Sequence, residues 1–176
     1  MRLREGNVEW TFPDGWTASK YDEWTFYRKQ FQRTADRGAK AADFVAITPE
    51  GDTLWLIEAK DYTFEPRGDS KEPLGIEVAR KARDTLAGLF AAAVNGGGDE
   101  QVVAGRALGA RRIRVVLHLE QPTTKTRIYP TILDRADVLQ KLKQVLKAID
   151  PHPMVMDTTH AGGVPWAVAW KPDKPS

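Results

Sequence analysis

Two acids and a lysine stand at the ends of two neighbouring apolar segments of this chain. Asp43 lies near the start of the segment 41–48, and Glu58 and Lys60 end the segment 53–60. Both segments have the length and apolar content of strands in a buried sheet. A strand that only packed against a core would not carry charged residues at these places, so we treat the three residues as a candidate site.

The connection between the two segments predicts how these residues face one another. The sequence Pro-Glu-Gly-Asp at 49–52 is typical of a turn. If the strands pair antiparallel about its middle, opposite residues have numbers that add to 101, which places Asp43 across from Glu58. Facing Cβ atoms lie about 5 Å apart, and two carboxylates at that distance repel unless a positive group lies between them. Glu58 and Lys60 project from one face of their strand and Ala59 from the other.

This group of residues has the chemistry of a metal-assisted phosphate site. Two carboxylates beside a backbone carbonyl, that of Ala59, suit Mg²⁺ or Mn²⁺. Lys60 is placed to orient or deprotonate a water molecule or to steady a developing phosphorane. A metal next to a phosphate supplies Lewis acidity and lowers the pKa of its bound water. Because the chain has no cysteine, oxygen or imidazole groups must hold any metal.

The same residues resemble the motif of the PD-(D/E)xK nuclease superfamily. That motif has an Asp early in one strand, a variable gap, and then Asp or Glu, any residue and Lys on the next strand. Here the positions read Asp43 and Glu58-Ala59-Lys60, with fourteen residues between Asp43 and Glu58. Ala42 stands where the family name has proline.

The order of the expected elements is also similar to that family over residues 17–120, whereas 121–176 match nothing that we can assign. The resemblance implies a restriction-endonuclease-like fold. Together with the mixed order of strands and helices, it predicts a single α/β domain over 1–176, a three-layer sandwich whose central mixed sheet is flanked by helices. We expect 171–176 to form a flexible tail. Strands are expected at 7–12, 41–48, 53–60, 112–120, 154–159 and 164–170, and helices at 21–33, 75–95 and 134–149.

The resemblance implies supporting residues on the two helices that flank the hairpin. An acid on the first helix adds a metal ligand or a water contact, and Glu23 is preferred over Asp22 because it is one residue from the apolar stripe of that helix. Thr17 or Ser19 would cap this helix. The alternative for Glu23 is an exposed acid stabilised by the helix dipole.

On the second helix, the resemblance brings Lys81 to a phosphate or to the metal-bound water. The alternative is an ordinary pair between Glu77 and Lys81, four residues apart, worth roughly a few tenths of a kcal/mol. Arg80 and Arg83 are expected to form a solvated surface or one that binds a nucleic-acid backbone.

The remaining polar residues give weaker indications. His118 and Glu120 share a face of the strand 112–120, and either could approach the metal, although a lone strand histidine is more often structural. Asp61 is expected to face away from the site. His152 and His160 have no partners at ligand spacing. Trp24 and Trp55 lie in apolar patterns and are expected in the core.

Composition sets outer limits on function. The formal net charge is +2 and basic residues gather in stretches such as YRKQFQRTADRGAK, which suits either solubility or a phosphate-rich partner. No apolar run approaches the roughly 20 residues that cross a membrane. The absence of cysteine and of an apolar leader favours a cytoplasmic protein.

The resemblance therefore predicts an enzyme, a divalent-metal-dependent nuclease that hydrolyses DNA phosphodiester bonds, with RNA as an alternative substrate. Its context would be restriction, mobile-element processing or defence against phage, as a homodimer or as a subunit of a larger defence complex. One alternative is a non-catalytic subunit of the same fold that binds nucleic acid or a protein partner. A third interpretation is an unrelated sandwich whose motif is coincidental.

Overall fold

The computed structural model describes residues 1–65, 67, 72–124, 127 and 132–172. Its main sheet has five strands in the spatial order β3-β4-β5-β6-β7. The first two pairings of that order are antiparallel and the last two are parallel, which confirms a mixed sheet. The strands are β3 (Thr17–Lys20), β4 (Phe44–Ile47), β5 (Thr53–Asp61), β6 (Arg112–Glu120) and β7 (Met154–Met156).

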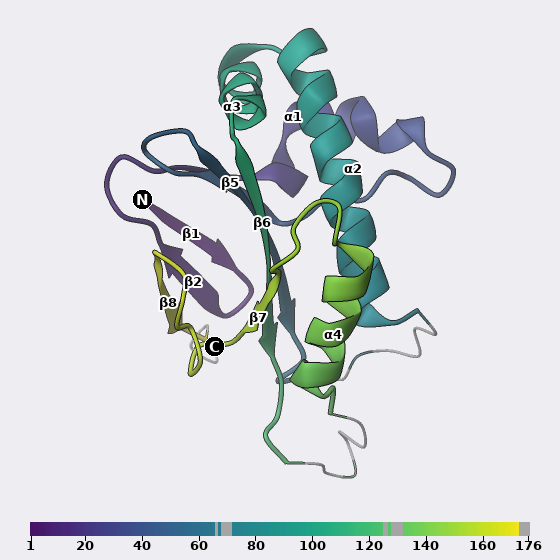
Figure 1. Cartoon of the computed structure of the whole chain (residues 1–176), viewed down its shortest axis with the longest axis vertical. Coiled ribbons are helices and arrows are strands. Elements are labelled where there is room, and N and C mark those ends of the chain that lie inside the picture. The colour runs from purple at the N-terminus through teal and green to yellow at the C-terminus, as the bar shows by residue number, and fades with distance from the viewer. Residues whose placement is uncertain (66, 68–71, 125–126, 128–131, 173–176) are drawn as a thin grey trace.

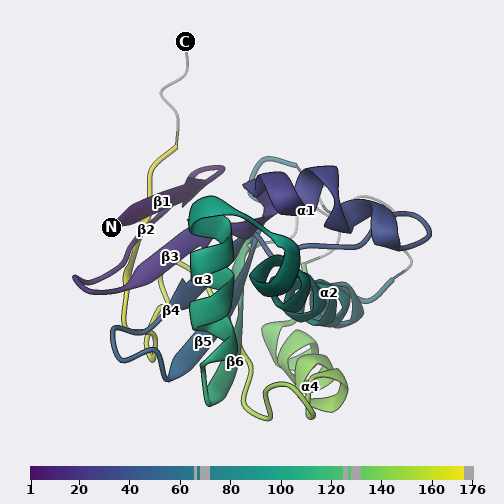
Figure 2. The same ribbon diagram turned by 90° about the horizontal axis from the view of Figure 1, so that it is seen from above.

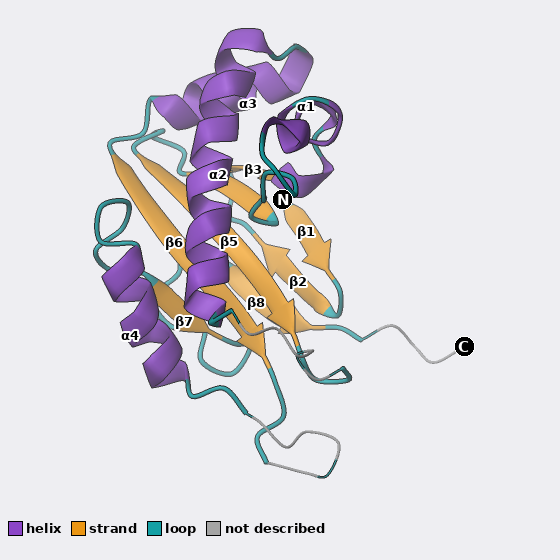
Figure 3. Ribbon diagram, turned by 90° about the vertical axis from the view of Figure 1, so that its right-hand side faces the viewer, coloured by secondary structure: helices purple, strands orange, loops and turns teal. Residues whose placement is uncertain are grey.

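Helices cover one face of this sheet (Figure 1), and α2 crosses in front of β5 and β6 when that face is viewed (Figure 3). Between the helices and the sheet lies a core of buried residues that includes Val45, Leu56 and Leu117 from the strands and Val78 and Leu89 from α2. The helices are α1 (Thr25–Lys29), α2 (Leu74–Asn95), α3 (Gly98–Leu108) and α4 (Arg135–Val145), and two short 3₁₀ turns, η1 (Tyr21–Glu23) and η2 (Phe31–Thr34), flank α1.

A second, smaller sheet covers the opposite face, as the view from above shows (Figure 2). It is antiparallel and has the order β1-β2-β8, formed by β1 (Arg2–Glu5), β2 (Val8–Thr11) and β8 (Ala167–Trp170). Aromatic side chains, among them Trp10, Trp55 and Trp166, fill the space between the two sheets. The predicted α/β architecture with a central mixed sheet is thus confirmed. Helices form the layer on one face of this sheet, and β1, β2 and β8 form the layer on the other.

The predicted helix over 21–33 is also wrong in detail. Thr17 and Ser19, expected as caps, belong to β3, and the chain then forms η1, α1 and η2 in turn. Trp24 has extended backbone angles (φ −58°, ψ 135°) that interrupt the helix. The carboxylate of Glu100, on α3, then accepts hydrogen bonds from the backbone N–H groups of Thr25 and Phe26. A distant residue therefore supplies the cap that the local sequence lacks.

Close packing sets where this segment lies against α2. A Cβ atom at Gly88 would overlap the hydroxyl of Tyr21 and touch the ring of Phe31, so only glycine admits this approach. Trp24 and Trp55 are buried, as expected. The expected tail at 171–176 lies outside the described residues beyond position 172. In the described part of the chain, no helix has the length and apolar character needed to cross a membrane.

Candidate functional site

The hairpin of β4 and β5 has the predicted register. Phe44 lies opposite Ile57 and Ile47 opposite Leu54, so partner numbers add to 101. Asp43 directly precedes β4, and its Oδ2 accepts a hydrogen bond of 2.6 Å from the backbone N–H of Ala59. This bond fixes the Asp43 carboxylate beside the end of β5.

Glu58 is the centre of the site. Its side chain is 1% exposed, and its Oε1 lies 2.9 Å from Lys60 Nζ and 2.5 Å from Lys81 Nζ. The same Lys81 Nζ lies 3.6 Å from Asp43 Oδ1. The ammonium of Lys81 is therefore the positive group between the two carboxylates, which such a pair needs in order to be stable. We call Asp43, Glu58, Lys60 and Lys81 the carboxylate–lysine site.

Helix α2 places Lys81 beside the two carboxylates, because hydrogen bonds join this helix to the segment that precedes β4. Thr85 Oγ1 accepts a 2.9 Å hydrogen bond from Ala42 N, and Asp84 Oδ2 accepts one of 2.9 Å from Lys40 N. One turn before Lys81, Glu77 pairs with Lys60 at 2.8 Å and with Arg67 at 3.4 Å. The alternative Glu77–Lys81 pair is therefore not what the structure shows.

Burial raises the pKa of both carboxyl groups of this site. Burial and the nearby charge of Asp43 raise the pKa of Glu58 from 4.5 to about 7, against the opposing effect of the two lysines. Burial also raises the pKa of Asp43, although Lys81 and the N–H of Ala59 oppose the rise. Burial alone would lower the pKa of Lys81, but the charges of Glu58 and Asp43 outweigh it and raise that pKa. The acids are thus poorly solvated, which favours any further cation.

The donor set fits a divalent cation for which water or phosphate supplies most of the ligands. Glu58 Oε2 is buried and has no hydrogen-bond partner. In an extended strand the carbonyl of a residue points to the same edge as its N–H, so the Ala59 carbonyl points toward Asp43. No group of three or more His, Asp or Glu side chains suited to a metal occurs among the described residues. Mg²⁺ commonly binds proteins through only one or two carboxylates, which this site supplies.

The acid that η1 turns toward this site is Asp22, not the preferred Glu23. Glu23 pairs with Lys20 at 2.8 Å and is half exposed. Burial and the charge of Asp43 raise the pKa of Asp22, whose Oδ1 is buried without a partner. A 3₁₀ turn has about 3.0 residues per turn instead of 3.6, which changes the residue that faces a given direction. The expected α-helix would have presented a different face.

Arg80 and Arg83 lie outside the carboxylate–lysine site. Arg80 forms an ion pair with Glu72, and Arg83 is 69% exposed and pairs with its neighbour Asp84 at 2.8 Å. Neither side chain contacts the two carboxylates of the site.

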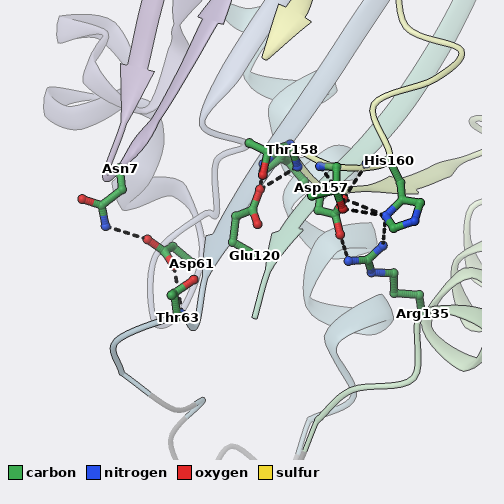
Figure 4. A network of polar contacts seen from close by, with 10 residues as sticks. Asn7, Asp61, Thr63, Glu120, Arg135, Asp157, Thr158 and His160 are labelled. Atoms are coloured by element: carbon green, nitrogen blue, oxygen red, sulfur yellow. Dashed lines mark hydrogen bonds and ion pairs between the residues drawn. The ribbon is translucent and has the colours of Figure 1, made fainter. Parts of the chain in front are cut away.

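His118 and Glu120 lie on the other face of the sheet, so the idea that either approaches the metal is wrong. His118 is the register partner of Ala59, whose side chain points away from the site. Its ring is buried against Trp10, and its Nε2 lies 2.8 Å from Glu120 Oε1. Asp61 faces away from the site, as expected, and accepts a hydrogen bond from the side chain of Asn7 (Figure 4).

The same figure shows a polar network that sequence reasoning missed (Figure 4). Asp157, after β7, accepts hydrogen bonds from the backbone N–H groups of Thr159 and His160 and forms an ion pair with Arg135 of α4. We call Arg135, Asp157 and His160 the Asp157 network. No spacing in the sequence links Arg135 to residues more than twenty positions later.

A groove opens beside the carboxylate–lysine site on the helix side of the sheet. Its volume is about 510 Å³. Asp43 and Lys81 line it together with groups from the segment 22–40, namely Asp22, Arg28, Gln32 and Lys40. The basic stretch noted in the sequence is therefore adjacent to the site.

No protein-family model matches the chain, and no solved structure matches it. A similar curated protein is a cysteine–tRNA ligase of Neisseria meningitidis serogroup A, 30% identical over 208 aligned positions. The match covers 95% of this chain, and the chain spans 29% of the length of that relative.

This similarity contradicts the prediction of a DNA-hydrolysing nuclease and of a role in restriction or defence. The relative is named as a tRNA ligase, and a ligase is not a phosphodiester hydrolase. The sequence motif misled because any hairpin that gathers two acids and a lysine produces the same spacing, whatever reaction or ligand it serves. What the comparisons establish is a likeness between this chain and part of a tRNA ligase.

Proposed function

We propose that this chain is an RNA-binding module that acts on tRNA, and that the carboxylate–lysine site binds a phosphate of that RNA together with a divalent cation. The observation that carries the proposal is the position of the Lys81 ammonium between Asp43 and Glu58, next to a groove. We further propose a restriction-endonuclease-like fold, supported by the order of elements from β4 to β6, in which this end of the sheet serves for binding.

The similarity to a tRNA ligase supports the choice of RNA. The chain spans only 29% of the length of that relative, so we do not assign the ligase reaction to this chain. What this chain contributes is a site and its adjoining groove. The expected association with DNA, with a second copy or with a larger complex stays a prediction.

The two lysines of the site have different roles in the proposed binding of a phosphate. Lys60 is held by Glu58 and Glu77, so its ammonium has a fixed position at the end of β5. Lys81 contacts both carboxylates and lines the groove, so it is the cation that an incoming phosphate meets. A bound Mg²⁺ or Mn²⁺ would neutralise Asp43 and Glu58 and attract phosphate oxygens. Lysines and divalent cations are both common phosphate-binding groups.

The test measures binding of a labelled tRNA transcript by fluorescence anisotropy, with Mg²⁺ or with EDTA. We expect binding that Mg²⁺ strengthens and that Asp43→Asn weakens by roughly tenfold, the loss of one charge-assisted contact. Isothermal titration of Mn²⁺ into both proteins should show weaker binding to the variant. A denaturing gel checks the length of the RNA after each titration.

Asp137→Asn is the matched control, since Asp137 is an exposed acid of α4, which lies across α2 from α1 (Figure 2). It should bind like the wild type. Equal affinity for tRNA in Mg²⁺ and in EDTA, or for a DNA duplex and tRNA, would overturn the proposal.

A further inference from the structure

The segment 28–40 concentrates the positive charge of the chain. It contains five basic residues and one acid, a formal charge of +4, whereas the whole chain has +2. The rest of the chain is therefore net acidic. The five residues are Arg28, Lys29, Arg33, Arg37 and Lys40, all of them exposed.

These side chains differ from Arg80 and Arg83 of α2 in having no acidic partner in the described part of the chain. Within the described residues, none of the five forms an ion pair, and Arg28 donates instead to the backbone carbonyl of Asp22 at 2.8 Å. Arg80 and Arg83, by contrast, are both paired with acids. Unpaired exposed cations on one segment are typical of a surface for a polyanion.

The groove connects this segment to the carboxylate–lysine site. Of its lining residues, Arg28, Gln32 and Lys40 are exposed and form what we call the rim, whereas Asp22, Asp43 and Lys81 are less exposed and line the inner end. The side chains of the rim are two cations and an amide. A phosphate at the inner end meets Lys81 but also two acids, so its binding depends on a further cation, whereas binding at the rim does not.

The rim is held in place before any ligand arrives. Tyr27 donates from its hydroxyl to Ala39 O at 2.8 Å, and Ala39 N donates to Gln32 O at 2.8 Å. The backbone of Lys40 is bound in turn by Asp84 of α2. A surface that is already ordered loses less entropy on binding.

The occupant must reach a recessed inner end. Asp43 is 9% exposed, so a phosphate must enter the groove to lie beside it. Single-stranded RNA has a backbone that can bend into such a recess, and a positive groove can follow that backbone. Tyr27, buried in the groove wall with its hydroxyl engaged, offers no platform for base stacking. Contacts to phosphates then dominate, and these do not depend on sequence.

We infer that the groove binds a single-stranded segment of RNA, whose phosphates run from Arg28 and Lys40 at the rim to Lys81 at the inner end. This inference rests on the proposed function, since it names the strand that the carboxylate–lysine site receives. It adds a binding surface, the rim, that no part of the motif predicts.

The test uses the full chain and a labelled single-stranded RNA of roughly 12 nucleotides, within the usual range of single-strand binding sites. We expect the double variant Arg28→Gln/Lys40→Gln to lose affinity by about tenfold. The slope of log affinity against log salt concentration should become shallower by about 1.4, the value for two lost phosphate contacts on a single strand. Mn²⁺ binding, measured by calorimetry, should not change. The control is Lys143→Gln/Lys147→Gln, the same charge change at and just beyond the end of α4.

The outcomes separate the two proposals. If Lys81→Met weakens RNA binding but the rim variant has the affinity and salt slope of the wild type, the groove inference fails and the proposed function stands. If the rim variant loses affinity while Lys81→Met and EDTA change nothing, the proposed function fails, and so does the path of the RNA to Lys81, with binding confined to the rim. Equal binding of duplex RNA would overturn the single-stranded assignment, and no RNA binding at all would overturn both.

Discussion

Two buried carboxylates near the same end of the domain have opposite surroundings. Asp157 uses both oxygens: Oδ1 accepts from Thr159 N and His160 N, and Oδ2 pairs with Arg135. Glu58 shares one oxygen between two lysines and leaves Oε2 without a partner. The first arrangement is complete and closes a loop against a helix. The second is incomplete and lies beside a groove, which is the arrangement that a ligand can improve.

The largest effect should come from the complete network. Asp157→Ala removes two backbone hydrogen bonds and leaves Arg135 without its acid, so we expect a loss of about 3 kcal/mol in the free energy of unfolding. Urea unfolding measures it, with the exposed Asp36→Ala as control, where the change should stay within about 0.5 kcal/mol. Mn²⁺ affinity of the refolded variant should equal that of the wild type. A stable Asp157→Ala protein would mean that the network is dispensable.

The pH dependence of stability should distinguish the two acids. The pKa of Glu58 rises from 4.5 to about 7 on folding, so between these pH values the folded state binds more protons than the unfolded state. Its contribution to stability is therefore present at low pH and decreases as pH rises through this window. For Glu58→Gln that decrease is absent, and the variant should gain roughly 2 kcal/mol relative to the wild type between pH 4.5 and 7.

Urea unfolding of both proteins at several pH values in EDTA measures this gain. Parallel stability curves for the wild type and Glu58→Gln would show that the surroundings of Glu58 do not disfavour its charge. The comparison between the two carboxylates would then lose its electrostatic basis.

A smaller effect should come from exchanging one cation for another. Lys81→Met leaves Asp43 and Glu58 facing each other without the intervening ammonium, so a divalent cation should stabilise this variant more than the wild type. We expect the additional gain at saturating Mn²⁺ to be about 1 kcal/mol, read from the midpoint of thermal unfolding. Lys147→Met is the control and should respond to Mn²⁺ like the wild type. An equal response of Lys81→Met and the wild type would show that Lys81 does not compete with a metal.

The hairpin and its charged residues could be predicted because their information is local. The turn at 49–52 set the register, and the strand 112–120 was predicted with the bounds it has. Lys81 was singled out through the resemblance, which places this half of its helix against the same end of the sheet. The structure puts its ammonium between the two acids.

What the sequence did not predict depends on contacts between distant segments. Helix α3 was missed because it begins at the third of three consecutive glycines, and this residue, Gly98, has a positive φ of 57°. Glu23 was preferred over Asp22 as the acid that faces the site, but the structure turns Asp22 toward it. A 3₁₀ turn replaces the expected α-helix here, and the close packing of Tyr21 against Gly88 sets its position. The reaction class failed because the motif describes a geometry and not a substrate.

The cap that Glu100 provides to α1 has a consequence for how the protein folds. The two hydrogen bonds join residues 75 and 74 positions apart in the chain. Contacts of such long sequence separation form late, since the intervening loop must be closed first. A nascent chain that has not yet produced Glu100 therefore carries its basic segment without the shape that α1 later gives it. Hydrogen exchange during refolding should find the amides of Thr25 and Phe26 protected only after those of α2.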